Sequence, residues 1–291
     1  MTHVPSTVIR PSLLPLLLLL LPLPVLGQVH AGESTGGLAS HLQALGAAAN
    51  DAQRDSANAA VKQELGAILG SDSAFTASFT GVPISHIDAP DGTFRLFTWN
   101  VPYSNGSFLY EGFLLVKKRS GNALYGLRDM TDHIAKPATA QLGPENWYGA
   151  VYYEMIPVQD GRRTYYTLLG WKGYSMVETR KVIEVLSLSG PTPKFGAPLF
   201  TGKKQRLLRD VFAFTAQGSM LLRWEPLRKA VLMDHLSATR PELEGQPAFM
   251  APDLSYDSYT WEKGQWRYQR DVDMRGNDRG KPYKAPPKET R

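Results

Sequence analysis

The sequence predicts a mainly β protein, built from antiparallel sheets in a sandwich or barrel-like arrangement, with a helical segment near the N-terminus. The first observation is that short runs rich in β-branched and aromatic residues recur from Phe75 onward. The second is that turn residues separate these runs about every ten residues, without helical patterns between them. The third is an Ala-rich, Pro-free stretch at residues 34–70, whose leucines have helical spacing.

The first 31 residues have the pattern of a secretory signal peptide. A polar start that carries Arg10 precedes an apolar stretch at 13–26, and two small-residue cleavage patterns follow, which end at Gly27 and Ala31. The apolar stretch is shorter than the roughly 20 residues that a membrane-spanning helix needs, and no later apolar run approaches that length. We therefore expect export from a bacterial cytoplasm, with the mature protein periplasmic or secreted after cleavage and without a membrane span.

Cysteine content and charge narrow the class of protein further. The chain has no cysteine, which excludes disulfides and thiolate catalysis and suits a bacterial envelope. The net charge is +5, but Arg10 and the basic tail at 274–291 account for all of it, which leaves the body of the chain neutral. A neutral body is no platform for nucleic acid. The tail, rich in Pro, Gly and Lys, is predicted to be disordered.

The helical segment at 34–70 is predicted to form a pair of helices that packs on the main domain. Leu38, Leu42 and Leu45 form one apolar stripe, and a second stripe runs from Ala57 to Leu69. Asn50-Asp51 interrupts the run and is suited to cap the second helix. A helix that binds a partner is the alternative interpretation of these stripes.

Two hairpins are predicted at the start of the β domain, which spans 75–273. Strands at 93–102 and 107–117 flank Asn105-Gly106, the strongest short hairpin signal. Strands at 150–158 and 163–171 flank a turn with Asp160-Gly161. In the first hairpin Phe94 and Leu96 point to one face and Phe97 and Trp99 to the other, so we expect these strands to be covered on both sides. Further strands are predicted at 180–188, 208–215, 219–225, 229–236, 257–262 and 265–270, with Lys263-Gly264 as the last turn. Residues 128–147 are predicted to form a short helix or a long loop.

Several segments resemble a family of exported β-rich proteins from Bacteroidota-type bacteria. They are Trp-Tyr-Gly-Ala-Val-Tyr-Tyr-Glu-Met-Ile-Pro at 147–157, Phe-Thr-Trp-Asn at 97–100, Phe-Gly-Ala-Pro-Leu-Phe at 195–200 and the Asp-His-Leu…Pro-Asp…Tyr-Asp series at 234–257. The resemblance covers about residues 75–273 and implies a location in the bacterial envelope. It implies no activity, cofactor or catalytic residue.

Several motifs of known chemistry do not occur in the sequence. There is no His-Glu-x-x-His zinc motif, no Gly-x-Ser-x-Gly elbow, no phosphate-binding Gly-rich loop and no dinucleotide fingerprint. His133 follows Asp129 and Asp132, a pattern that favours a polar turn with a helix cap over a metal site.

The segment 232–259 holds the candidate catalytic residues. Asp234 and His235 end a predicted strand, and a return of the chain would bring Asp253 and Asp257 beside them. An Asp–His pair would activate water as a general base. Carboxylates of Asp253 and Asp257 would instead suit Ca²⁺ or Mg²⁺, and no other cofactor is indicated. The alternative is structural, with the aspartates capping turns of an acidic loop.

Aromatic residues offer a second kind of candidate site. Paired tyrosines at 152–153 and 165–166 and several tryptophans are suited to stack on sugar rings, although sheet stabilisation accounts for them equally well. Trp99, Asn100 and Arg209 are the candidate ligand-binding residues. We therefore expect an envelope-associated protein with a non-catalytic binding or structural role, and a glycan or another envelope component as its partner. The alternative is a periplasmic hydrolase or a cation-dependent enzyme.

Overall fold

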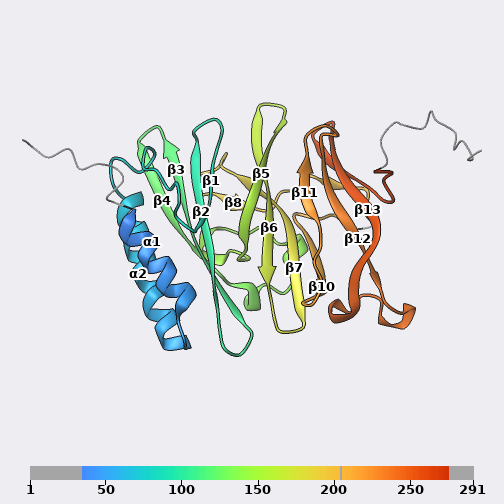
Figure 1. Ribbon diagram of the computed structural model, residues 1–291. Helices are drawn as coiled ribbons and strands as arrows, with labels where there is room; N and C mark the ends of the chain where they lie inside the picture. The colour runs from blue at the N-terminus through green and yellow to red at the C-terminus, as the bar shows by residue number, and fades with distance from the viewer. Residues whose placement is uncertain (1–34, 204, 275–291) are drawn as a thin grey trace, which may run out of the picture. The chain divides into compact units, whose positions relative to one another are not determined.

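The computed structural model describes residues 35–203 and 205–274, and it confirms a mainly β fold with antiparallel sheets and two helices near the N-terminus (Figure 1). The expected signal peptide at 1–31 lies outside the described residues, as does all of the basic tail beyond residue 274. No helix within the described ranges is long and apolar enough to cross a membrane.

Two antiparallel helices cover one face of the first sheet. Helix α1 spans Gly36–Ala47 and helix α2 spans Asp51–Leu69. The side chain of Asn50 accepts a hydrogen bond of 3.0 Å from the backbone N–H of Gln53, which confirms the predicted cap. The predicted leucine stripe of α1 is buried.

The first sheet has the order β1-β2-β3-β4, with β1 at Ser85–Asp88, β2 at Phe94–Pro102, β3 at Phe108–Lys118 and β4 at Gly121–Arg128. The predicted hairpin at Asn105-Gly106 joins β2 to β3. Gly106 has a φ of 81°, a conformation in which glycine has no Cβ to strain. The Asn105 side chain accepts hydrogen bonds from the backbone and the hydroxyl of Ser107, which stabilises the turn.

The middle sheet has the order β10-β7-β6-β5, with β8 paired to β7. Its strands are β5 at Val151–Asp160, β6 at Arg163–Gly173, β7 at Glu178–Ser187, β8 at Lys194–Phe195 and β10 at Asp210–Thr215. The β5–β6 turn confirms the second predicted hairpin, with Gly161 at a φ of 59°.

The third sheet has the order β11-β12-β13-β14-β9. Its strands are β11 at Leu222–Glu225, β12 at Ala230–Ala238, β13 at Met250–Glu262, β14 at Gln265–Gln269 and β9 at Phe200–Thr201. β9 pairs with β14 in parallel, the one departure from antiparallel pairing among the described strand pairs. β13 begins seven residues before the predicted start at 257, so the predicted acidic loop is shorter than the sequence indicated. Short 3₁₀ turns at Pro241–Leu243 and Pro247–Phe249 occupy it.

Three hydrophobic cores separate the helices and the sheets into four layers. The first core joins the helices to Phe97, Trp99 and Leu115. The second core, between the first and middle sheets, contains Phe94 and Leu96. The third lies between the middle and third sheets. Phe94 and Leu96 therefore face the opposite side of β2 from Phe97 and Trp99, which confirms that β2 is covered on both faces.

The interval 128–147 contains no α-helix. It forms three 3₁₀ turns, at Thr131–His133, Pro137–Thr139 and Pro144–Asn146, joined by loop. This segment connects the first sheet to the middle sheet and supplies one wall of the pocket described next.

Candidate functional site

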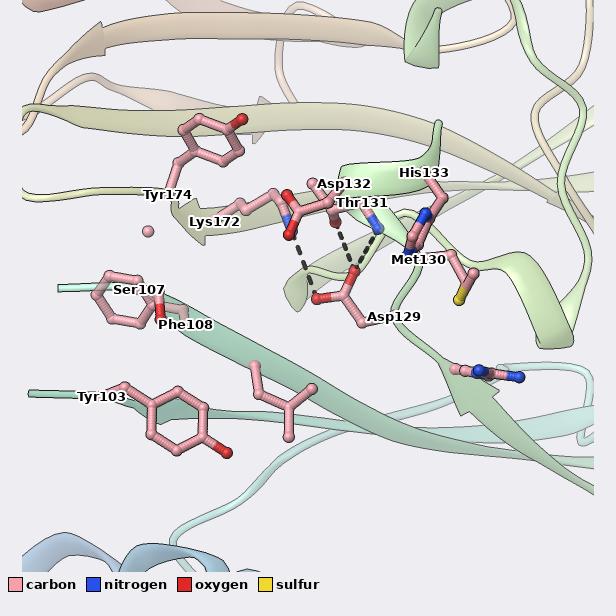
Figure 2. Close-up of a pocket in the computed structure, with 13 residues that line it drawn as sticks. Tyr103, Ser107, Phe108, Asp129, Met130, Thr131, Asp132, His133, Lys172 and Tyr174 are labelled. Carbon is pink, nitrogen blue, oxygen red and sulfur yellow. Dashed lines mark hydrogen bonds and ion pairs between the residues drawn. The ribbon is translucent and has the colours of Figure 1, made fainter. Parts of the chain in front are cut away.

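A pocket of about 380 Å³ lies where strands of the first and middle sheets end. Its walls come from three distant parts of the chain: the β2–β3 hairpin, the segment after β4 and the end of β6. Figure 2 shows Tyr103 and Phe108 on the side of the hairpin and Tyr174 and Lys172 on the side of β6, with the segment from Asp129 to His133 between them. Small-molecule sites commonly have volumes of roughly 300–1,000 Å³, so the pocket has the size of a ligand site.

A buried lysine forms the floor of this pocket. The side chain of Lys172 is 2% exposed, and its Nζ donates a hydrogen bond of 2.8 Å to the backbone oxygen of Gly149. The same nitrogen lies 4.0 Å from the centre of the Tyr110 ring, within cation–π range. Burial lowers the pKa of Lys172 to about 8, because a charged amine loses hydration there, and the nearby carboxylate of Asp129 offsets only part of that effect.

Asp129 is held in place by hydrogen bonds from Thr131 and from Tyr110 on β3. Its Oδ1 accepts hydrogen bonds from the backbone N–H, at 3.0 Å, and the hydroxyl of Thr131, and its Oδ2 accepts one of 3.3 Å from the backbone of Tyr110. These bonds form the polar turn predicted before His133, but the helix cap predicted with it is absent, since Met130 stands at the N-cap of Thr131–His133 without a side-chain hydrogen bond. Gly149 has a φ of 67°, and a Cβ there would lie 2.6 Å from the Asp129 carboxylate, so only glycine fits beside it.

The rim of the pocket is polar and exposed. Arg128, Asp132 and His133 line it and are open to solvent. Together with Lys172 and Asp129 they give two cations, two carboxylates and one histidine, so the pocket has nearly balanced charge. Such a lining offers hydrogen-bond donors and acceptors to a neutral polar ligand without strongly favouring an ion of either sign.

Aromatic side chains form the remaining wall, and each is fixed by a contact outside the pocket. The ring of Phe108 packs edge-on against Trp171, with centroids 5.8 Å apart. The guanidinium of Arg180 lies 3.4 Å from the centre of the Tyr174 ring. The Tyr103 hydroxyl donates to Asp55, and burial together with this bond raises the pKa of Tyr103 to about 12. The rings are therefore held in place before any ligand binds.

The candidate catalytic residues are brought together only in part. His235 Nδ1 lies 2.7 Å from Asp257 Oδ2, and the Tyr268 hydroxyl donates to the same oxygen. Asp234 instead accepts a hydrogen bond of 2.7 Å from the backbone of Leu221 on the neighbouring chain segment. Arg270 places its NH2 group 2.9 Å from His235 Nε2, the nitrogen that would accept a proton from water. The structure therefore contains an Asp–His pair with both ring nitrogens engaged.

Asp253 lies outside this pair. Its carboxylate accepts hydrogen bonds from the backbone and hydroxyl of Ser255. Slight burial works to raise the pKa of Asp253, but these hydrogen bonds outweigh it and lower the pKa. This local pattern is the turn-stabilising role that the structural alternative predicted, although it occurs within strand β13 and not in a loop. Among residues 35–203 and 205–274, no group of three or more His, Asp and Glu side chains is placed to hold a metal ion.

The candidate ligand-binding residues lie in three separate environments. Trp99 is buried beneath α2 and donates a hydrogen bond of 2.8 Å to Asn58, while Asn100 pairs with Tyr110 in the first sheet. Arg209 is fully buried, where its guanidinium binds Glu184 and the backbone oxygens of Pro137, Ala140 and Phe195. The structure does not gather these residues around one cavity with the 234–257 segment.

Sequence reasoning missed Lys172 altogether. It stands in Gly170-Trp171-Lys172-Gly173, where a lysine at a strand end is typical of a solvated position. The flanking glycines carried the usable signal, because glycine within a strand often marks a close approach of other groups. A Cβ on Gly173 would lie 2.7 Å from the Phe108 ring.

The chain was compared with protein-family models, curated proteins and solved structures. None of them matches this chain. The assignment of function therefore depends on the geometry of the molecule itself.

Proposed function

We propose that the protein is an exported, envelope-associated binding protein, and that the pocket above Lys172 binds a neutral, polyhydroxylated ligand such as a short glycan. One observation carries the proposal: a single cavity combines fixed aromatic rings with a charge-balanced set of donors and acceptors. Flat rings pack against the apolar C–H faces of sugars, while charged side chains hydrogen-bond pairs of hydroxyls. Export is supported by the leader pattern in residues 1–31.

The pocket is suited to binding more than to catalysis. Asp129 already accepts three hydrogen bonds, and the Lys172 amine already donates to Gly149. These buried groups shape the floor, and the exposed Asp132 and His133 remain to contact the ligand.

Glycan binding is tested by screening neutral and amino-sugar oligosaccharides of bacterial envelopes, followed by calorimetric titration. We expect Phe108→Ala and Asp132→Asn to weaken binding at least tenfold, while the matched exposed controls Phe249→Ala and Asp72→Asn bind like the wild type. Thermal melts establish that each variant is folded. Binding that is unchanged in Asp132→Asn and Phe108→Ala, or no binding of any saccharide, would overturn the proposal.

Export is tested separately from ligand binding. N-terminal sequencing of the protein recovered from the envelope of an expressing bacterium is expected to show a mature end after Gly27 or Ala31. A protein that stays in the cytoplasm with residue 1 retained contradicts that part of the proposal.

A second candidate function, a hydrolase or a cation-dependent enzyme, is favoured by the hydrogen bond between His235 and Asp257. The carboxylate orients the imidazole as a general base would require, and the exposed Arg270 has to swing away to free Nε2. If this function holds, Arg270→Ala increases ester hydrolysis and His235→Gln abolishes it. Ca²⁺ or Mg²⁺ raises the melting temperature, and a chelator lowers it, if a cation binds the folded protein at Asp253 and Asp257. No hydrolysis and no shift in melting temperature exclude this candidate.

A further inference from the structure

A second hollow, of about 630 Å³, has five cationic residues among those that line it; we call it the basic pocket. These side chains come from two turns that are far apart in the sequence. Lys117, Lys118 and Arg119 lie at the β3–β4 turn, and Arg162 and Arg163 lie at the β5–β6 turn. All five residues are exposed. Because the body of the chain is neutral overall, this concentration of positive charge is a local feature and does not reflect a basic protein.

The cations of the basic pocket are not neutralised by neighbouring carboxylates. None of the five forms an ion pair with an acidic residue of the part of the chain that the structure describes. Asp91 approaches the wall, where it accepts hydrogen bonds from Thr93 and Tyr166. Asp160, on the arginine-bearing hairpin, lies against Gly264 of the third sheet. Asp160 stands directly opposite Arg163 across the hairpin, so both side chains lie on the third-sheet face of the middle sheet. The Lys117 ammonium lies 5.9 Å from the Phe75 ring, on the helix-facing side of β3. Lys118, Arg119 and Arg162 are therefore the cations left to face the hollow.

Hydrogen bonds beneath the charged side chains hold the walls of the hollow together. The Tyr166 hydroxyl lies 2.9 Å from the Thr93 hydroxyl, which ties the first sheet to the middle sheet under the pocket. Lys118 Nζ donates to the backbone oxygen of Pro191 and to the Tyr125 hydroxyl, which anchors the loop after β7 to β3. The pocket is therefore a defined hollow between two sheets with hydroxyl groups in its wall.

The basic pocket is separate from the pocket above Lys172. Phe108 and Lys117 stand near opposite ends of β3, nine residues apart, which corresponds to roughly 30 Å along a strand. Arg163 and Lys172 stand near opposite ends of β6 in the same way. The two pockets therefore open at opposite ends of strands β3 and β6, in the first and middle sheets.

From this geometry we propose that the basic pocket binds a ligand that carries at least two phosphate or sulfate groups close together, such as a phosphorylated or sulfated sugar. Arginine binds such groups through two parallel hydrogen bonds, and lysine adds point charges. The hollow shape favours a compact multivalent anion that enters between the turns. A free sugar phosphate and the headgroup of a lipid share this chemistry, and the experiment separates them.

The test measures binding of tripolyphosphate and of a sulfated disaccharide to the purified protein by calorimetry at low and moderate salt. We expect both to bind, with affinity that falls as salt screens the charges. We expect Arg119→Gln/Arg162→Gln to weaken binding at least tenfold. The charge-matched control Lys136→Gln/Arg240→Gln, two exposed cations outside the pocket, is expected to bind like the wild type. The basic tail is identical in every variant, so its contribution cancels.

A second arm uses vesicles of phosphatidylcholine with and without phosphatidylglycerol. Binding to the anionic vesicles that tripolyphosphate displaces identifies a lipid headgroup as a source of the ligand, and soluble binding alone identifies a free anion; both support the pocket. Equal affinities of the pocket and control variants, or vesicle binding that soluble anions do not displace, overturn the proposal.

Discussion

Lys172 Nζ lies 3.9 Å from Asp129 Oδ2, and the two side chains are only 2% and 8% exposed. This separation is too long for a hydrogen bond. The carboxylate therefore compensates the buried amine incompletely, and the pKa of Lys172 remains near 8. The pair couples the floor of the pocket above Lys172 to the stability of the whole fold.

Stability is predicted to rise with pH above about pH 8. Lys172 has a folded-state pKa of about 8 against an ordinary value of 10.5, so between these values the unfolded state binds more protons. Lys172 should contribute an increase of about 1.5 kcal/mol to the free energy of unfolding between about pH 8 and pH 9.5. Tyrosines with raised folded-state pKa values, such as Tyr103 and Tyr166, oppose the rise near the upper end of this range, so the contribution of Lys172 is read as the difference between wild type and Lys172→Met. Urea denaturation across this range measures the rise. The rise should be largely lost in Lys172→Met and kept in Lys194→Met, an exposed control. An equal rise in both variants would contradict the assignment of the effect to Lys172.

Gly149→Ala is predicted to destabilise the protein more than Gly161→Ala. Both glycines have positive φ, so each substitution carries backbone strain of about 1–2 kcal/mol. The new Cβ at 149 also collides with the Asp129 carboxylate, whereas nothing lies within 4 Å of a Cβ at 161. The difference in free energy of unfolding between the two variants, expected to be about 1–2 kcal/mol, isolates the collision. Equal losses would show that Asp129 moves aside freely.

Arg209→Met is predicted to destabilise the protein by about 3–5 kcal/mol, because it leaves the fully buried Glu184 carboxylate without its cation. The double variant Arg209→Met/Glu184→Met should recover part of the loss, since no unpaired charge remains. Arg223→Met breaks the ion pair with Glu225 in which the arginine is half exposed, and should cost at most about 1 kcal/mol. Denaturant titration compares the three, and a loss below that of Arg223→Met would refute the role of Arg209.

Asp257→Asn is predicted to lower the free energy of unfolding by about 1–3 kcal/mol. Its carboxylate accepts hydrogen bonds from His235, the Tyr268 hydroxyl and the backbone of Asp271, and an amide replaces one of the accepting oxygens with a donor. Asp253→Asn, at an exposed position of the same strand, should change stability by less than about 1 kcal/mol. Thermal melts of both variants test this, and the order of the two losses decides it.

The parts of the fold that depend on short-range signals could be predicted from sequence. Asn105-Gly106 specifies a tight turn through positive φ and a side chain that bonds its own backbone, so the hairpin follows from two residues. Burial of both faces followed from the alternation of Phe94, Leu96, Phe97 and Trp99. These features need no knowledge of which strands become neighbours.

The start of β13 was not predictable in this way. Pro252 in the segment 250–256 is typical of a loop, because proline has no N–H for a sheet. In the structure β14 pairs only with residues 258–262, so Pro252 lies where β13 has β12 as its one partner, beside the register shift between Asp234 and Leu236. Pairing with one neighbour leaves room for proline, and that depends on the end of a strand elsewhere in the chain.

The pocket above Lys172 was also beyond prediction from sequence, since residues near 103, 130 and 172 meet only through sheet order. No local pattern shows that the end of β4 comes beside the end of β6. The His235–Asp257 contact was within reach because it joins two adjacent antiparallel strands.

The middle sheet is packed on both faces, but the chain supplies those coverings at different times. The helices and first sheet precede it, whereas the third sheet is formed mostly from residues after 221. During synthesis a nascent chain that ends near residue 215 therefore lacks strands β11 to β14, and the apolar face that carries Leu169, Ile183 and Val185 is covered only in part, by residues such as Leu199 and Leu207. Such an unfinished polypeptide is expected to self-associate or to require a chaperone until its last quarter emerges from the ribosome.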